Sequence, residues 1–282
     1  MISLYSFDLA FSADDQGRPV FAAFPFMFDG APLTGISCGV SSRFAGDMAY
    51  SGGTSRLALL KALGLDPLRV YSLNQVHSRE VLAVDRLCPP VLPADGMVSD
   101  DREIILSVTV ADCLPVYLFD TETGVFGLVH SGWKGTGIAL SALKLMAERW
   151  GTRPEAIAAA LGPCIDSCCY KVDGERAAAF EKEFGVIPMP AEPAPDIAFF
   201  KQVTRREDTP GGPAWYLDLK AANVRLLAGG GVRNISVCNG CTFTDERLGS
   251  YRREGEGYTR MAALCGRFPR FNTACRKRRL CL

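Results

Sequence analysis

Histidine is scarce in this chain: His77 and His130 are the only two among 282 residues. Any chemistry that requires imidazole must therefore use one or both, and they are too few for a conventional multicopper centre.

The 31 basic residues balance the 31 acidic ones, which argues against a general nucleic-acid binder. The apolar runs fall far short of the ~18 residues that a membrane span requires, and the first residues lack the basic region of a signal peptide. We expect a soluble cytoplasmic protein that binds neither nucleic acid nor membrane.

The composition is that of a globular protein, with 48% hydrophobic and 22% charged residues, and excludes wholesale disorder. Residues 187–197 contain four prolines, so this stretch is neither a helix interior nor a central strand. We predict one elaborated catalytic domain over residues 1–266, with a long excursion near 187–213. Residues 267–282 hold six basic residues and no acid, and we interpret them as a basic C-terminal tail.

The eleven cysteines form no obvious disulfide framework, because their number is odd and no secretion signal is present. Cys238 and Cys241 have CxxC spacing, but no second pair lies at zinc-ribbon distance. Cys164, Cys168 and Cys169 are close enough in sequence to approach a metal, although buried thiols are the commoner outcome for such residues.

Strands and helices are mixed along the chain without strict alternation. This order favours an α+β fold with mixed sheets over a doubly wound parallel sheet. The hydrophobic patterns predict strands over 69–73, 80–84, 104–110, 114–119, 125–129, 235–237 and 250–252, and helices over 55–63, 138–150, 174–184 and 219–227.

Three chemically capable side chains follow or end apolar strands: His77, Cys113 and His130. Two imidazoles and one thiolate suit zinc, with copper as a second choice. Three protein ligands leave a fourth position open, which is typical of a catalytic zinc site. The residues also permit a reading without metal, in which Cys113 is a nucleophile, His130 its base, and Asp112 or another acid orients the base.

Basic side chains near glycine-rich turns are candidates for binding an anion. Lys134 lies in the segment 131–137, which holds three glycines before a predicted helix, and the backbone N–H groups at a helix N-terminus attract phosphate. Arg252 lies in a second arginine-rich segment, and Arg43 and Arg56 are isolated candidates for the same role.

Several motifs occur together, in order, between about Gly39 and Leu264. They read NQVH (74–77), ADG (94–96), TVADCLPV (109–116), HSGWKG (130–135), LGPCI (161–165) and SYRR (250–253). Together they resemble the YfiH/laccase-domain family, once labelled polyphenol oxidoreductases and now described as purine nucleoside phosphorylases.

The resemblance implies a layered α+β sandwich and a zinc site at His77, Cys113 and His130. It also implies phosphorolysis of adenosine, inosine and methylthioadenosine, with an adenosine deaminase side activity. The usual arginine after the tryptophan of the HAGWRG motif is Lys134 here, so a point charge replaces a planar fork.

We therefore expect a zinc-dependent purine nucleoside phosphorylase whose partners are a nucleoside and phosphate. His77, Cys113 and His130 are the expected metal-binding and catalytic residues, and Lys134, Arg252, Arg43 and Arg56 the expected phosphate-binding residues. The alternatives are a copper-dependent polyphenol oxidase, a Cys113/His130 hydrolase acting on cell-wall material, and a binding module with a structural zinc.

Overall fold

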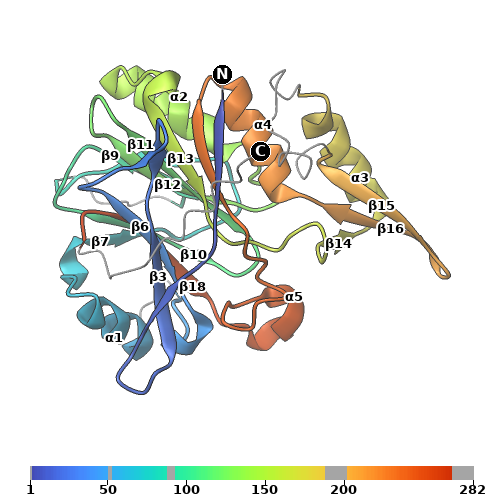
Figure 1. The fold of residues 1–282 in the computed structure, drawn as a ribbon, viewed down its shortest axis with the longest axis horizontal. Coiled ribbons are helices and arrows are strands. Elements are labelled where there is room, and N and C mark those ends of the chain that lie inside the picture. Colours follow the sequence, from blue (N-terminus) through green and yellow to red (C-terminus); the bar gives the residue numbers. More distant parts are fainter. Residues whose placement is uncertain (1, 50–52, 88–92, 188–201, 269–282) are drawn as a thin grey trace.

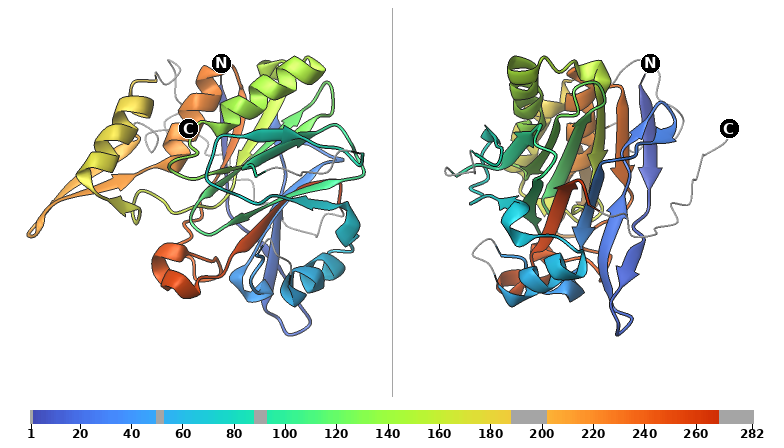
Figure 2. Two further views of the ribbon diagram at one scale, coloured as in Figure 1. Left: turned by 180° about the vertical axis from the view of Figure 1, so that it is seen from behind. Right: turned by 90° about the vertical axis from the view of Figure 1, so that its left-hand side faces the viewer.

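Two β-sheets lie face to face at the centre of the molecule, as the edge-on view of Figure 2 shows. The structure is a computed structural model that describes residues 2–49, 53–87, 93–187 and 202–268. The first sheet has seven strands in the spatial order β1 (Ser3–Phe7), β17 (Asn234–Cys238), β13 (Ile157–Leu161), β11 (Leu114–Asp120), β12 (Phe126–Ser131), β9 (Gly96–Ser99) and β8 (Val81–Ala83). The second has six, in the order β2 (Phe11–Ala13), β3 (Pro19–Phe24), β6 (Ser37–Ser41), β18 (Met261–Gly266), β10 (Ile105–Val110) and β7 (Val70–Ser72).

Helices cover the outer faces of both sheets, so the layers run helix, sheet, sheet, helix (Figure 1). Helices α2 (Ile138–Trp150) and α4 (Leu219–Gly229) pack on the seven-stranded sheet, and α1 (Thr54–Ala62) packs on the six-stranded sheet. Both sheets contain parallel and antiparallel pairs. The predicted α+β sandwich with mixed sheets is confirmed.

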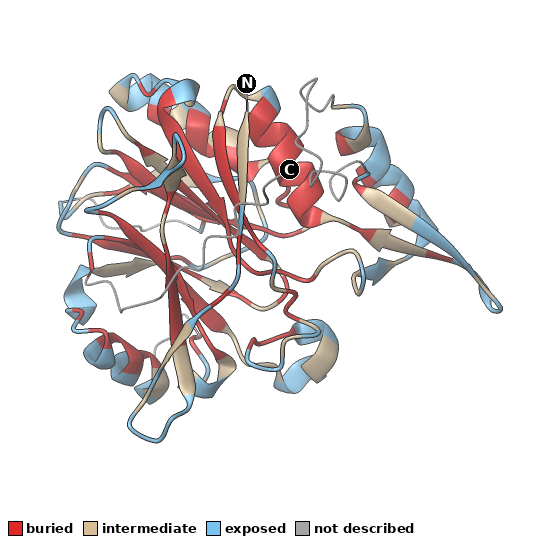
Figure 3. Ribbon diagram, viewed as in Figure 1, coloured by how far each residue is buried: buried red, intermediate tan, exposed pale blue. Residues whose placement is uncertain are grey.

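The core follows from the alternation of side chains along each strand. On β11, Val116 and Leu118 face the helices α2 and α4, whereas Tyr117 between them points into the space between the sheets. The Tyr117 hydroxyl donates a hydrogen bond of 2.8 Å to the carbonyl of Gly39 on β6. This bond ties one sheet to the other in a fully buried setting, where an unpaired polar group would be costly. Figure 3 shows that burial is concentrated in the sheets and in α4.

A smaller unit projects from one side of this sandwich (Figure 1). It contains α3 (Gly174–Phe180) with a π-helical turn at Glu181–Gly185, and a sheet of β14 (Lys171–Val172), β16 (Gly212–Leu217) and β15 (Thr204–Thr209). The described part of the excursion predicted near 187–213 contains β15 and the tight turn that joins it to β16. A two-stranded ribbon, β4 (Met27–Phe28) and β5 (Ala31–Pro32), completes the sheets.

The predicted strand at 250–252 is wrong, because these residues begin the short helix α5 (Tyr251–Glu254). The Ser250 hydroxyl accepts a hydrogen bond from the backbone N–H of Arg253, and the Glu254 carboxylate accepts one from the backbone N–H of Ser250. Reciprocal capping of this kind starts a helix.

Most other predicted elements lie within two residues of those observed, and the predicted helix at 138–150 coincides with α2. The strands before residue 42 were not predicted, nor were β9, β13, β14, β15, β16 and β18. Most of the predicted linker at 187–197 and most of the tail at 267–282 lie outside the described residues. Within the described ranges, no helix is both long and apolar enough to cross a membrane.

Candidate metal centre

The two histidines and Cys113 meet where the chain passes from one sheet to the other. Cys113 lies in the turn between β10 and β11, which belong to different sheets, His130 lies near the end of β12, and His77 lies in the loop between β7 and β8. Their candidate ligand atoms all lie within 4.8 Å of one another. The two imidazole rings have centroids 5.0 Å apart and are inclined by 78°. Three residues separated by up to 53 positions thus converge on one point.

The local backbone at this point is strained. His77 has φ of 60° and Asp112 has φ of 84°, a left-handed conformation that is costly for residues other than glycine. The Gln75 side chain holds the loop before His77 against β10. Its oxygen accepts hydrogen bonds from the backbone N–H and hydroxyl of Thr109, and its amide nitrogen donates one to the Thr109 carbonyl.

Asp95 holds both histidine segments in place from a fully buried position at the start of β9. Its carboxylate lies 2.9 Å from Nδ1 of His130 and accepts hydrogen bonds from the backbone N–H groups of Val76, His77 and Ser78. A carboxylate bonded to one ring nitrogen directs the other nitrogen of the imidazole toward a metal. Nε2 of His130 is therefore the nitrogen oriented for ligation.

The charges of the neighbours favour the ionised form of each group. Burial alone would raise the pKa of Asp95, but hydrogen bonds from His130 and Ser78 lower it to about 2. Burial would also raise the pKa of the Cys113 thiol, but His130 and His77 lower it to about 6. For His130, burial would lower the pKa, and the Cys113 thiolate and Asp95 raise it to about 9. A thiolate is the form of cysteine that binds metals.

The residues present fit a metal ion of the zinc class. The donor set is one sulfur and two imidazoles, of which His130 is buried and His77 is exposed, so a guest molecule can reach the ion from the His77 side. A Cβ built on Gly132 would lie 2.9 Å from Sγ of Cys113 and 3.4 Å from Cδ2 of His77. Glycine at this position keeps the space around the three ligands free of side-chain atoms.

Two cations flank one aromatic ring beside this centre. Nζ of Lys134 lies 5.6 Å from the centroid of the Trp133 ring, and the Arg176 guanidinium lies 4.6 Å from it. Arg176 belongs to α3, so the projecting unit contributes charge to the same region as the loop after β12. Sequence analysis did not single out Arg176, because only the tertiary fold brings α3 to Trp133.

Arg252 is joined to the centre through Asp112. Its backbone N–H donates to the Asp112 carboxylate over 2.7 Å, its guanidinium donates to the Lys171 carbonyl, and its Cζ lies 5.4 Å from the centroid of the Tyr170 ring. Asp112 also accepts a bond from the Thr242 hydroxyl. Asp112 therefore fixes α5 beside Cys113, and Asp95 is the acid that bonds to His130.

Arg43 and Arg56, the other two predicted anion-binding residues, have contacts elsewhere. The Arg43 guanidinium lies 3.7 Å from the Glu254 carboxylate. Arg56 is buried on α1 and donates to the hydroxyls of Ser72 and Ser107. Their role in binding phosphate stays a prediction.

The segment 131–137 leads into α2 as the sequence analysis predicts. Gly137, at φ of 105°, precedes the helix, and a Cβ there would lie 3.4 Å from the Arg79 guanidinium. The Thr136 hydroxyl donates to the Gly132 carbonyl and closes the turn.

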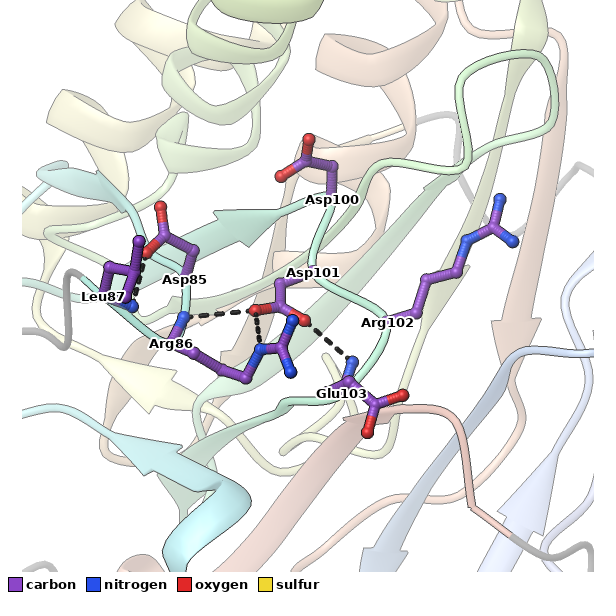
Figure 4. A pocket seen from close by; sticks show the side chains of 7 residues that line it. All are labelled: Asp85, Arg86, Leu87, Asp100, Asp101, Arg102 and Glu103. Carbon is purple, nitrogen blue, oxygen red and sulfur yellow. Dashed lines mark hydrogen bonds and ion pairs between the residues drawn. The ribbon is translucent and has the colours of Figure 1, made fainter.

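A surface depression between the segments 85–87 and 100–103 is separate from this centre. The Asp101 carboxylate accepts hydrogen bonds there from the backbone N–H and Nε of Arg86 and from the backbone N–H of Glu103 (Figure 4). His77, Cys113 and His130 are absent from its lining. Asp101 pairs with Arg86 inside the depression, and Glu103 and Asp85 pair with Arg69 and Arg149 outside it, so we assign no catalytic role to it.

The chain is 31% identical over 254 residues to a purine nucleoside phosphorylase of Corynebacterium glutamicum, covering 86% of this chain and 93% of the relative. It is 34% identical over 226 residues to the purine nucleoside phosphorylase YlmD of Geobacillus stearothermophilus, covering 75% of this chain and 76% of the relative.

The crystal structure of YlmD from Geobacillus stearothermophilus is similar to this one, with a TM-score of 0.71, 27% sequence identity, and coverage of 92% of this chain and 99% of that one. The fold also matches that of the Bacillus licheniformis hypothetical protein YfiH, with a TM-score of 0.67, 24% identity, and coverage of 82% and 92%. A family model described as multi-copper polyphenol oxidoreductase laccase matches residues 32–267. The chain therefore belongs to the multi-copper polyphenol oxidoreductase laccase family, which is the laccase-domain or YfiH family.

Proposed function

We propose that this protein is a zinc-dependent purine nucleoside phosphorylase that uses phosphate to cleave adenosine, inosine and methylthioadenosine to the free base and ribose 1-phosphate. The observation that carries the proposal is the convergence of His77, Cys113 and His130 within 4.8 Å. The names of the relatives in Corynebacterium and Geobacillus support the reaction. We further propose an adenosine deaminase side activity at the same centre.

His77, Cys113 and His130 would hold the zinc ion. When bound, zinc supplies Lewis acidity and a water molecule of lowered pKa. Asp95 keeps the His130 ring in the ligating orientation, and the Gln75 amide keeps the His77 loop against β10.

The cations beside the centre would bind and orient phosphate. Lys134 and Arg176 meet at the Trp133 ring, and Arg252 lies beside Tyr170. Phosphorolysis develops positive charge at C1′ of the ribose as the purine departs, so an anion held next to that carbon both stabilises the charge and completes the substitution. The rings of Trp133 and Tyr170 would offer apolar walls to the nucleoside.

Base release in the presence and absence of phosphate tests the reaction. We expect the zinc-loaded protein to release adenine from adenosine only when phosphate is present. Removal of zinc with a chelator should abolish adenine release, and adding zinc back should restore it. His77→Ala and Cys113→Ala should reduce the rate by at least about 100-fold. As a matched control, Cys265→Ala alters a buried cysteine of β18 that is not one of these three candidate ligands. Full activity in a folded Cys113→Ala variant would refute the proposal.

Two other functions predict different outcomes in the same preparations. A Cys113 hydrolase is compatible with the low thiol pKa and with the contact between Asp95 and His130. It should keep its activity after chelation and lose it on alkylation. A copper-dependent phenol oxidase should consume dioxygen with a phenol when Cu²⁺ is loaded, faster than free Cu²⁺ does.

A further inference from the structure

A second group of three sulfur atoms lies apart from His77, Cys113 and His130. Cys168 and Cys169 occupy a turn after β13, and Cys241 follows β17. Their three Sγ atoms lie within 4.8 Å of one another. Sγ of Cys168 is 3.1 Å from that of Cys169 and 3.9 Å from that of Cys241.

The three sulfur atoms are close enough together to share a single ion. With metal–sulfur bonds of about 2.3 Å, tetrahedral or trigonal geometry places the sulfurs roughly 3.8–4.0 Å apart. The distance of 3.9 Å between Sγ of Cys168 and Sγ of Cys241 falls in this range, whereas the 3.1 Å between Cys168 and Cys169 is shorter, so these two side chains would rotate slightly apart to bind an ion. Cys168 is exposed, Cys169 is half-buried and Cys241 is buried, so an ion can enter from solvent.

The surroundings of the buried sulfur resemble a ligand shell. The backbone N–H of Asp166 points at Sγ of Cys241 from 3.4 Å, and such N–H···S bonds stabilise metal-bound thiolates. The Asp166 carboxylate, which would otherwise repel thiolates, pairs with Nζ of Lys220 at 2.6 Å. A parallel bridge between Cys164 and Cys241 fixes the two segments relative to each other.

We propose that Cys168, Cys169 and Cys241 bind a thiophilic metal ion through three thiolates, at a site separate from His77, Cys113 and His130. Purely sulfur ligation favours soft ions such as Cu⁺ or Cd²⁺ over the hard oxygen-seeking cations. A dithiol redox pair would use only two of the sulfurs and would leave the convergence of the third without a role.

Cadmium alone is a suitable probe, because its thiolate complexes absorb in the ultraviolet and cadmium NMR reports the number of sulfur ligands. The reduced full-length protein, stripped with a chelator, should bind two Cd²⁺ per chain by native mass spectrometry. One ion should show a shift typical of three sulfurs, and the other a shift typical of one sulfur with two nitrogens.

The variants separate the two sites. Cys168→Ser, at an exposed position that a serine fits without refolding, should lose the three-sulfur signal and keep the other, along with phosphate-dependent nucleoside cleavage. Cys241→Ser should likewise lose the three-sulfur cadmium signal and keep the other cadmium signal. Cys113→Ser should keep only the three-sulfur signal, and Cys265→Ala should keep both.

Three results would overturn the proposal. They are a wild-type protein that binds one Cd²⁺, a Cys168→Ser variant with an unchanged three-sulfur signal, and a disulfide among these cysteines that persists in reductant and prevents cadmium binding. Because Cys168→Ser is assayed for nucleoside cleavage as well, failure of this proposal is distinguishable from failure of the proposed phosphorylase function.

Discussion

At the scale of single residues, Asp95 does more for the metal centre than its place in the sequence reveals. One buried carboxylate bonds to the His130 ring and to three consecutive backbone N–H groups around His77. It therefore fixes the orientation of one ligand and the backbone conformation of another. The strained φ of His77 is maintained by these bonds, as strain at functional sites usually is.

Replacing this carboxylate should weaken the metal centre without removing a ligand. In Asp95→Asn the anionic partner of His130 is lost, and one acceptor oxygen must serve where two did. We expect zinc affinity to fall by about 10–100-fold, measured by competition with a chromophoric chelator. Asp100→Asn, a neighbouring exposed acid, is the control, and an affinity equal to wild type in Asp95→Asn would contradict the prediction.

Adding a side chain in the space around the candidate ligands should also reduce activity. A methyl group in Gly132→Ala would lie 2.9 Å from Sγ of Cys113, closer than van der Waals contact permits, so the thiolate must move. We expect at least about a 10-fold loss of nucleoside cleavage from a misplacement of this size, with circular dichroism unchanged. Gly257→Ala, where the added methyl meets nothing within 4 Å, should behave as wild type. Equal rates in the two variants would count against the geometry.

At the scale of elements, an aspartate caps the first turn of α4 in the sandwich and another caps that of α3 in the projecting unit. Asp218 caps α4 by accepting a hydrogen bond from the backbone N–H of Ala221, and Asp173 caps α3 by accepting one from Arg176. The two caps differ in their surroundings. Burial raises the pKa of Asp218 to about 6, although the Ala221 N–H opposes this shift. For Asp173, the hydrogen bond from the Arg176 backbone N–H lowers the pKa.

This difference predicts opposite pH dependences of stability. The folded protein holds a proton on Asp218 more tightly than the unfolded chain does, so this group's contribution to the free energy of unfolding is present below pH 4 and is lost as the pH rises to about 6. In Asp218→Asn the cap remains and the titration disappears. The variant should therefore gain stability relative to wild type between pH 4 and 7, by at most about 3 kcal/mol.

Urea unfolding at several pH values measures this gain. Asp173→Asn is the matched control, because its lowered pKa gives the opposite sign: relative to wild type, the variant should lose stability as the pH rises toward 4 and show a constant deficit at higher pH. A constant difference between Asp218→Asn and wild type across this pH range would contradict the prediction.

At the scale of the whole molecule, the contact between the two sheets positions the metal centre. β10 lies in one sheet and β11 in the other, and Cys113 sits in the turn that joins them. Any shift of one sheet relative to the other moves Cys113 relative to His130 on β12. The stability of the interface and the geometry of the ligands are therefore linked.

The hydrogen bond from Tyr117 to Gly39 tests that link. Tyr117→Phe keeps the ring and leaves a buried carbonyl without its partner, so we expect the free energy of unfolding to fall by about 1–3 kcal/mol, measured by urea denaturation. Tyr251→Phe alters an exposed tyrosine and should change it by less than about 0.5 kcal/mol. An unchanged stability in Tyr117→Phe would show that the bond does not help to hold the sheets together.

The sequence by itself determined the elements that depend only on residues close together in the chain. The helix at 138–150 follows from apolar spacing without a breaker. The scarcity of histidine and the position of His77, Cys113 and His130 at strand ends pointed to these three residues, which the fold brings within 4.8 Å of one another. The strand predicted at 250–252 failed because a capping pair, Ser250 and Glu254, outweighed a β-rich composition. That signal was present in the sequence but spans only five residues.

The tertiary structure alone decided which distant residues act together. Asp95 reaches His130, Arg176 reaches Trp133, and Cys241 reaches Cys168 only because strands far apart in the chain are neighbours in the folded sheets. Strand order depends on long-range packing of the two sheet faces, and a residue's own neighbours in sequence carry little information about it. Local chemistry could therefore name the candidate ligands, whereas the residues that orient and surround them required the fold.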